Sequence, residues 1–116
     1  MKYCFLIFFI LLVSCSQQKE ASVSIVKIEK GRDANQIYYE NVELLNDGEQ
    51  PAYFVILIGK VYNKGSEIQF IEKGYGDIWP QESKTFKMSY DKIAFIPPDS
   101  IIYRITYSQS DINPVK

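Results

Sequence analysis

The chain has 116 residues, with 13 basic and 14 acidic side chains, a net charge of −1 and no histidine. A protein that binds nucleic acid needs a concentrated basic face, which this balance of charges does not provide. The lack of histidine removes the commonest general base and the commonest metal ligand. We therefore expect a protein that is not an enzyme and that uses no cofactor.

The first fifteen residues have the pattern of an export signal. Lys2 precedes an apolar run of about 11 residues, which is too short to cross a bilayer as a helix. The run ends in Leu12-Val13-Ser14-Cys15, which resembles the signal of bacterial lipoproteins. This resemblance implies cleavage before Cys15 and a diacylglyceryl group on its thiol. The alternative is an ordinary secretory signal that is cut close by and leaves a soluble protein.

The lipoprotein resemblance places the protein in the bacterial cell envelope, anchored to a membrane by the lipid on Cys15. Ser16, which stands where some signals have an aspartate, favours the outer membrane over the inner one in a host with two membranes. Residues 1–14 are then the signal peptide, and residues 15–22, which are small and polar, form the lipidated tether. Residues 23–109 form one domain and residues 110–116 a C-terminal tail.

From Val23 onward, apolar residues recur at period two between clusters of Gly, Asn, Asp and Pro, which predicts β-strands. The first strand changes face at Ile25-Val26, so we expect a β-bulge there. Residues 53–58 are apolar on both faces and predict the central, most buried strand. The other expected strands span residues 36–45, 67–73, 84–90 and 101–107, with breaks at residues 46–51, 63–66 and 97–99.

Six or seven short strands at this spacing predict an all-β fold, a single antiparallel β-sandwich, with a small open barrel as the alternative. Residues 42–86 resemble the small immunoglobulin-like domains of prokaryotic lipoproteins, including the family named for its FxLYD motif. The resemblance is carried by Asn46-Asp47-Gly48, by Gly59-Lys60-Val61-Tyr62-Asn63 at the motif, and by Pro80-Gln81-Glu82-Ser83. It implies an immunoglobulin-like sandwich and no particular activity.

The acidic residues do not form a recognisable catalytic or metal-binding pattern. The pairs nearest in sequence, Asp77 with Glu82 and Glu67 with Glu72, flank turns rather than a segment that forms a pocket. The turn at residues 46–49 offers too few ligands for calcium. We therefore predict no catalytic residue and no metal site.

Residues 74–80 contain the only tryptophan of the chain, and the glycines at positions 74 and 76 predict a loop that a partner can approach closely. The family resemblance implies that Ile78 faces the core, and strict alternation then turns Trp79 outward. Exposed Trp and Tyr side chains stack on sugars and anchor protein interfaces, so Tyr75, Asp77 and Trp79 are the candidate partner-binding residues. The alternative is that the loop folds back and Trp79 fills the end of the sandwich.

Together these features predict a lipid-anchored envelope protein that acts as a non-enzymatic binding or assembly module. Its expected partners are the membrane, through the lipid on Cys15, and an envelope protein or a surface glycan. The alternative is an inhibitor or protective lipoprotein that inserts residues 74–80 into the cleft of an enzyme.

Overall fold

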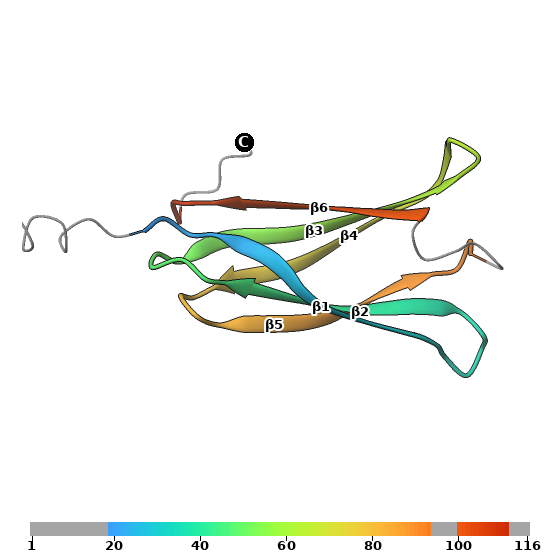
Figure 1. The fold of residues 1–116 in the computed structure, drawn as a ribbon, viewed down its shortest axis with the longest axis horizontal. Helices are drawn as coiled ribbons and strands as arrows, with labels where there is room; N and C mark the ends of the chain where they lie inside the picture. The colour runs from blue at the N-terminus through green and yellow to red at the C-terminus, as the bar shows by residue number, and fades with distance from the viewer. Residues whose placement is uncertain (1–18, 94–99, 112–116) are drawn as a thin grey trace, which may run out of the picture.

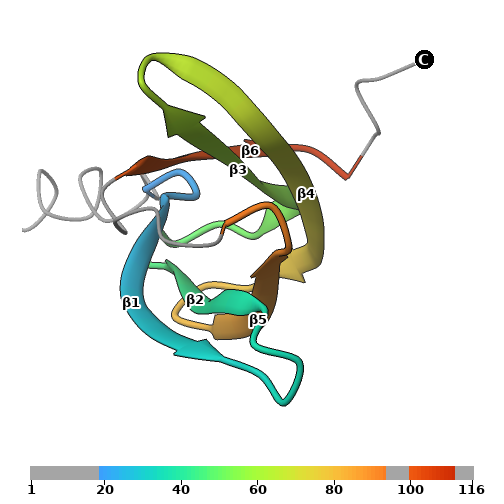
Figure 2. The ribbon, with the colours of Figure 1, turned by 90° about the vertical axis from the view of Figure 1, so that its right-hand side faces the viewer.

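The computed structural model describes residues 19–93 and 100–111 and folds them into two layers of β-sheet (Figures 1 and 2). The strands are β1 (Val23–Arg32), β2 (Tyr38–Asn46), β3 (Ala52–Asn63), β4 (Ser66–Ile78), β5 (Ser83–Tyr90) and β6 (Ile101–Ser108). One sheet has the order β1-β2-β5 and the other β4-β3-β6, and every pairing is antiparallel. The prediction of an all-β fold built from antiparallel strands is confirmed, and its two sheets have the layout of a β-sandwich.

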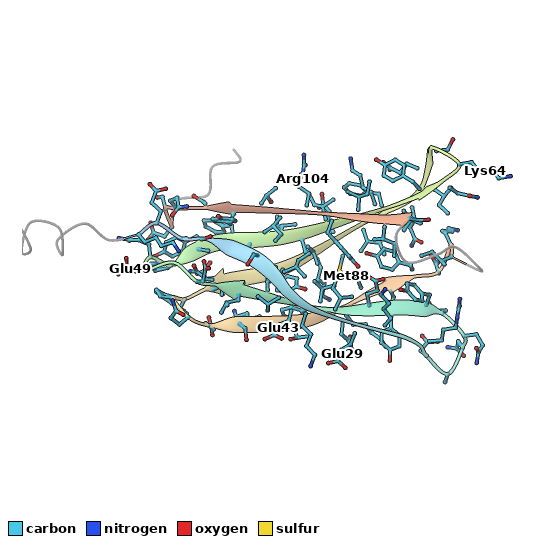
Figure 3. All side chains as sticks on the ribbon, viewed as in Figure 1. Glu29, Glu43, Glu49, Lys64, Met88 and Arg104 are labelled. Carbon is cyan, nitrogen blue, oxygen red and sulfur yellow. The ribbon has the colours of Figure 1, made fainter. Side chains whose placement is uncertain are left out.

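The two middle strands, β2 and β3, supply much of the core. In β2 every second residue from Tyr38 to Asn46 is buried, as expected when one face of a strand meets the other sheet. In β3, Val55 and Leu57 are fully buried, and the strand is paired on both sides, so its predicted central position is confirmed. Met88 of β5 is also fully buried, and Figure 3 shows its side chain between the two sheets.

Two of the four edge strands, β6 and β1, agree with the predictions made from apolar alternation. In β6 the odd-numbered residues from Ile101 to Tyr107 pack against the core, while Arg104 points into solvent (Figure 3). In the ladder of β1 with β2 the register shifts between Ile25 and Lys27, which confirms the predicted bulge. Alternation of apolar and polar residues therefore predicts the two faces of β6 and the bulge of β1 correctly.

The predicted short strand at residues 67–73 and the predicted loop at residues 74–80 are wrong. β4 continues from Ser66 to Ile78 and pairs with β3 along this length. Gly74 and Gly76 do not end the strand, because each lies opposite a residue of the long strand β3. Gly76 adopts a φ of 73° where the register shifts, a bulge conformation that glycine takes at little cost.

The predicted tether is wrong for residues 19–22, which run along the domain instead of away from it. Ala21 is only 6% exposed, and its N–H donates to Gln109 Oε1 at 3.0 Å. The Lys19 carbonyl accepts the N–H of Glu49 at 3.0 Å. The domain therefore includes residues that were assigned to the tether, because backbone hydrogen bonds hold a polar segment that has no apolar periodicity of its own.

Several sequence-based expectations fall outside the described residues. They concern the signal peptide and Cys15, the break at residues 97–99 and the part of the tail beyond Asp111.

Leu57 and Arg104 give a matched test of the core. Leu57 is fully buried, so Leu57→Asp would bury an unpaired carboxylate at a cost of several kcal/mol, against a total stability of about 5–15 kcal/mol. Arg104→Asp puts the same side chain on the exposed face of β6 and should change the free energy of unfolding by less than about 0.5 kcal/mol. Urea unfolding followed by circular dichroism measures both, and equal tolerance at the two positions would contradict this assignment of the core.

Candidate functional site

The structure separates the residues that were predicted to bind a partner. Tyr75 is 2% exposed, and its hydroxyl donates to the Val42 carbonyl at 2.6 Å. Its ring meets that of Phe86 edge-on, with centroids 4.7 Å apart. The prediction that Tyr75 belongs to an exposed contact surface is therefore wrong. The physical reason is that residues 74–78 are held in a paired strand, which turns Tyr75 toward the core.

Trp79, in contrast, is an exposed aromatic residue just after the end of β4. Ile78 is fully buried and Trp79 is 53% exposed, so the predicted outward orientation is confirmed and Trp79 does not fill the end of the sandwich. The rings of Tyr53 and Trp79 meet edge-on, with centroids 6.3 Å apart and planes at 76°. These two side chains, from β3 and from the turn after β4, form one aromatic surface.

A tight turn of residues 79–82 fixes the backbone of Trp79. The Glu82 N–H donates to the Trp79 carbonyl at 3.0 Å, and the Glu82 carboxylate accepts the Trp79 N–H at 2.9 Å. Pro80 takes the second position and Gln81 the third, with a φ of 66°, which is the pattern of a type II turn. Both ends of the turn are hydrogen-bonded, so the Trp79 ring is carried by a rigid support.

Phe54, the neighbour of Tyr53, lies at a β-bulge. Residues 52–55 of β3 lie opposite residues 76–78 of β4, so β3 has one residue more than its partner there. Phe54 has a φ of 54°, which a bulky residue rarely adopts, and its side chain is 37% exposed. Its N–H donates to Asp77 Oδ1 at 3.2 Å. Asp77, another predicted contact residue, therefore has its carboxylate bonded to the bulge.

Asn46 ties the start of the domain to this region. Its side chain is fully buried and makes four hydrogen bonds. Nδ2 donates to the carbonyls of Gln50 and Ile78, at 2.8 and 3.0 Å. Oδ1 accepts the N–H groups of Ser22 and Gly48, at 3.1 and 3.0 Å. One amide therefore connects the N-terminal segment, the turn after β2 and the end of β4.

Two further contacts bring the turns together. A Cβ at position 48 would collide with the carbonyl oxygen of Glu20, so Gly48 allows the N-terminal segment to pass close to the turn. Gln81 donates from its backbone to the Asn46 carbonyl at 2.7 Å and from Nε2 to the Gly48 carbonyl at 3.3 Å. We call this region the tether end and define it as residues 19–22, 46–54 and 77–84. Figure 3 shows Glu49 at the tether end and Lys64 at the opposite end of the sandwich.

The tether end is acidic. It carries five carboxylates and two ammonium groups, which belong to Glu20, Asp47, Glu49, Asp77 and Glu82 and to Lys19 and Lys84. The Lys84 ammonium donates to the Tyr75 carbonyl at 3.2 Å. The aromatic surface is therefore surrounded by net negative charge.

A second polar cluster lies inside the sandwich, away from the tether end. The Glu40 side chain is 2% exposed, and its carboxylate accepts the hydroxyls of Tyr38 at 2.5 Å and Tyr103 at 2.7 Å. The Tyr90 hydroxyl donates to that of Tyr103 at 2.9 Å. Gly59 leaves room for this contact, because a Cβ there would collide with the Tyr90 hydroxyl. The cluster links β2 and β5 to β6, so its arrangement is that of a structural network between the sheets.

Sequence reasoning missed three of the residues that organise these regions. Glu40 had a readable signal, since it shares the inward parity of Tyr38 and Val42 in β2. Asn46 shares this inward parity at the end of β2, but its hydrogen-bond partners had no local signal, and neither did the backbone conformation of Phe54. An Asn before Asp-Gly is an ordinary turn residue, and the positive φ of Phe54 arises from the pairing of three strands.

Comparison of the chain with protein-family models, with curated proteins and with solved structures finds no match. The resemblance to the FxLYD family therefore stays a prediction. Within residues 19–93 and 100–111, no group of three acidic, Cys or His side chains could hold a metal ion. The same part of the chain contains no helix that is long and apolar enough to cross a membrane.

The buried tyrosines predict a loss of stability in alkali. Burial raises the pKa of both Tyr75 and Tyr90 to about 12, above the usual value of 10.0. The unfolded chain releases these protons near pH 10.0, whereas the folded chain keeps them until about pH 12. The contribution of these two hydroxyls to the free energy of unfolding is therefore fully present below pH 10.0 and is lost as the pH rises through about 12.

We expect the thermal midpoint to fall steeply across that interval, and Tyr75→Phe to make the fall shallower. Differential scanning fluorimetry over a pH series measures this. A midpoint that does not depend on pH in the interval would contradict the burial of these hydroxyls.

Proposed function

We propose that the chain is a lipid-anchored, non-enzymatic binding or assembly module of the bacterial cell envelope, with the outer membrane as its location in a host with two membranes. Its anchor is the diacylglyceryl group on Cys15, and its domain is an immunoglobulin-like sandwich. The order β1-β2-β5 corresponds to strands A, B and E of an immunoglobulin domain, and β4-β3-β6 corresponds to strands C′, C and F. The described residues include no counterpart of strand G.

The observation that carries the proposal is the bonding of residues 19–22 into the tether end. Cys15 precedes Lys19 by four residues, which span at most about 14 Å when fully extended. A lipid on Cys15 therefore keeps the aromatic surface of Tyr53 and Trp79 close to the headgroups. We assign contact to this surface, and its partner is a component of the envelope that lies at the membrane.

The inhibitor alternative has less support. Residues 74–78 are part of β4 and are paired with β3, so they do not form a free loop that could enter a cleft. Of residues 74–80, Trp79 and Pro80 lie beyond β4, in a turn whose two ends are hydrogen-bonded to each other.

Replacing the anchoring cysteine tests the proposal. Cys15→Ala should abolish labelling by radioactive palmitate and block maturation, because the diacylglyceryl group is attached to this thiol. It should also release the protein from membranes, because buried acyl chains contribute about 0.8 kcal/mol per methylene to membrane binding. Ser16→Ala is the matched control and should label and mature normally. Mass spectrometry of the mature protein and density fractionation of envelopes give the readouts. A Cys15→Ala protein that matures at the same size and still fractionates with membranes would contradict the proposal.

A further inference from the structure

We infer that the tether end binds the headgroup region of the lipid bilayer directly, through Trp79 and Tyr53. This inference rests on the proposed function, because it takes the lipid on Cys15 as given, and it names the partner of the same aromatic surface. The bilayer, rather than a protein or a glycan, is the occupant that the geometry favours.

The hydrogen bonds between residues 19–22 and the rest of the tether end decide which part of the domain meets the membrane. Lys19 is bonded twice to Glu49: its N–H donates to Oε1 at 2.7 Å, and its carbonyl accepts the Glu49 N–H at 3.0 Å. The neighbouring Gly48 is bonded to Gln81, in the turn that carries Trp79. Figure 1 shows the β2–β3 turn and the β4–β5 turn at the end of the sandwich where β1 begins, opposite the β3–β4 turn. The four residues after Cys15 are too few to present the opposite end to the same membrane.

The exposed side chains at this end are of the type that membrane interfaces favour. Trp and Tyr concentrate at the boundary between lipid and water, because their rings are apolar while the indole N–H and the phenol hydroxyl reach polar groups. Trp79 is 53% exposed and Phe54 is 37% exposed, and Tyr53 supports the Trp79 ring from the side. Hydrogen bonds to Glu82 and Asp77 already fix the backbones of Trp79 and Phe54. Binding to the membrane therefore loses little conformational entropy of the chain.

The charges of the tether end select between kinds of lipid. Its five carboxylates outnumber its two ammonium groups, so an anionic membrane surface repels it. This repulsion acts over a Debye length of about 10 Å in 0.1 M salt and is weaker at higher ionic strength. The tether end therefore binds zwitterionic headgroups better than anionic ones, and salt reduces the difference.

The only tryptophan of the chain is the probe for this contact. The mature lipidated protein is reconstituted into phosphatidylcholine vesicles that contain a lipid with a nitroxide on its headgroup. We expect the emission of Trp79 to shift to shorter wavelength and to lose most of its intensity. Replacing part of the phosphatidylcholine by phosphatidylglycerol should reduce the quenching at low salt, and added salt should restore it.

A matched control moves the tryptophan from the turn after β4 into β4 itself. Phe70 is 47% exposed in β4, nine residues from Trp79, which is a distance of roughly 30 Å along a strand. The variant Trp79→Phe with Phe70→Trp keeps an aromatic ring at both positions and keeps the lipid anchor. Its emission should be neither shifted nor quenched by the same vesicles.

Equal quenching of the two proteins would overturn the inference, and so would the absence of quenching at Trp79 in a protein that floats with the vesicles. Both results leave the anchor intact. Trp79 that stays unquenched in vesicles but is shielded from acrylamide in native envelopes would overturn the inference in favour of a protein or glycan partner. A mature protein that does not float with the vesicles would overturn the anchor itself, and the inference with it.

Discussion

The buried amide of Asn46 joins the parts of the molecule on which its attachment depends. Two of its hydrogen bonds hold the turn after β2, through Gln50 and Gly48, and the other two reach Ser22 and Ile78. A buried polar group that loses its partner costs about 1–3 kcal/mol, so each of these bonds matters more than an exposed one. Because all four are made, the start of the domain and the turn that carries Trp79 occupy fixed positions relative to each other.

The described residues contain one other fully enclosed polar side chain, that of Glu40. Its bond from the Tyr103 hydroxyl crosses from β2 to β6, and therefore from one sheet to the other. Hydrogen-bonded polar groups in a core restrict the register in which two sheets can pack, because a shifted register would leave them unpaired. Asn46 thus organises the tether end, whereas Glu40 and its tyrosines organise the part of the core nearer the opposite end.

The fold could be predicted from the sequence where neighbouring residues carry the signal, and not where contacts between distant residues decide the conformation. Local apolar patterns correctly placed Val55 and Leu57 in a buried central strand. The family resemblance put Ile78 inside, and alternation from Ile78 then correctly turned Trp79 outward. The predictions failed where a distant segment decides the conformation. Gly74 and Gly76 look like the ends of a strand, but pairing with β3 keeps them within β4. In the same way, the polar segment 19–22 looks like a free tether until the turn of Asn46 supplies its hydrogen-bond partners.

Only part of the candidate site could be predicted, because the other part depends on contacts between residues far apart in sequence. The outward direction of Trp79 follows from alternation with the inward Ile78. Its location near residues 19–22, in contrast, follows from contacts between residues far apart in sequence. The bulge at Phe54 belongs to this second class, because it needs the register of β3 with both β4 and β6. Sequence therefore identified an exposed aromatic residue, and the structure adds where on the domain that residue lies.

Amide hydrogen exchange at Ser22 tests whether residues 19–22 are fixed to the turn of Asn46. In this account the Ser22 N–H donates to the buried Oδ1 of Asn46, and the Gly48 N–H donates to the same atom. We predict that both amides exchange slowly, with protection close to that of the core strands, and that Asn46→Ala accelerates both together. Exchange of Ser22 at the rate of an unfolded chain, with Gly48 still protected, would contradict the account. The start of the domain would then be a free tether, and the tether end would have no fixed position relative to the lipid.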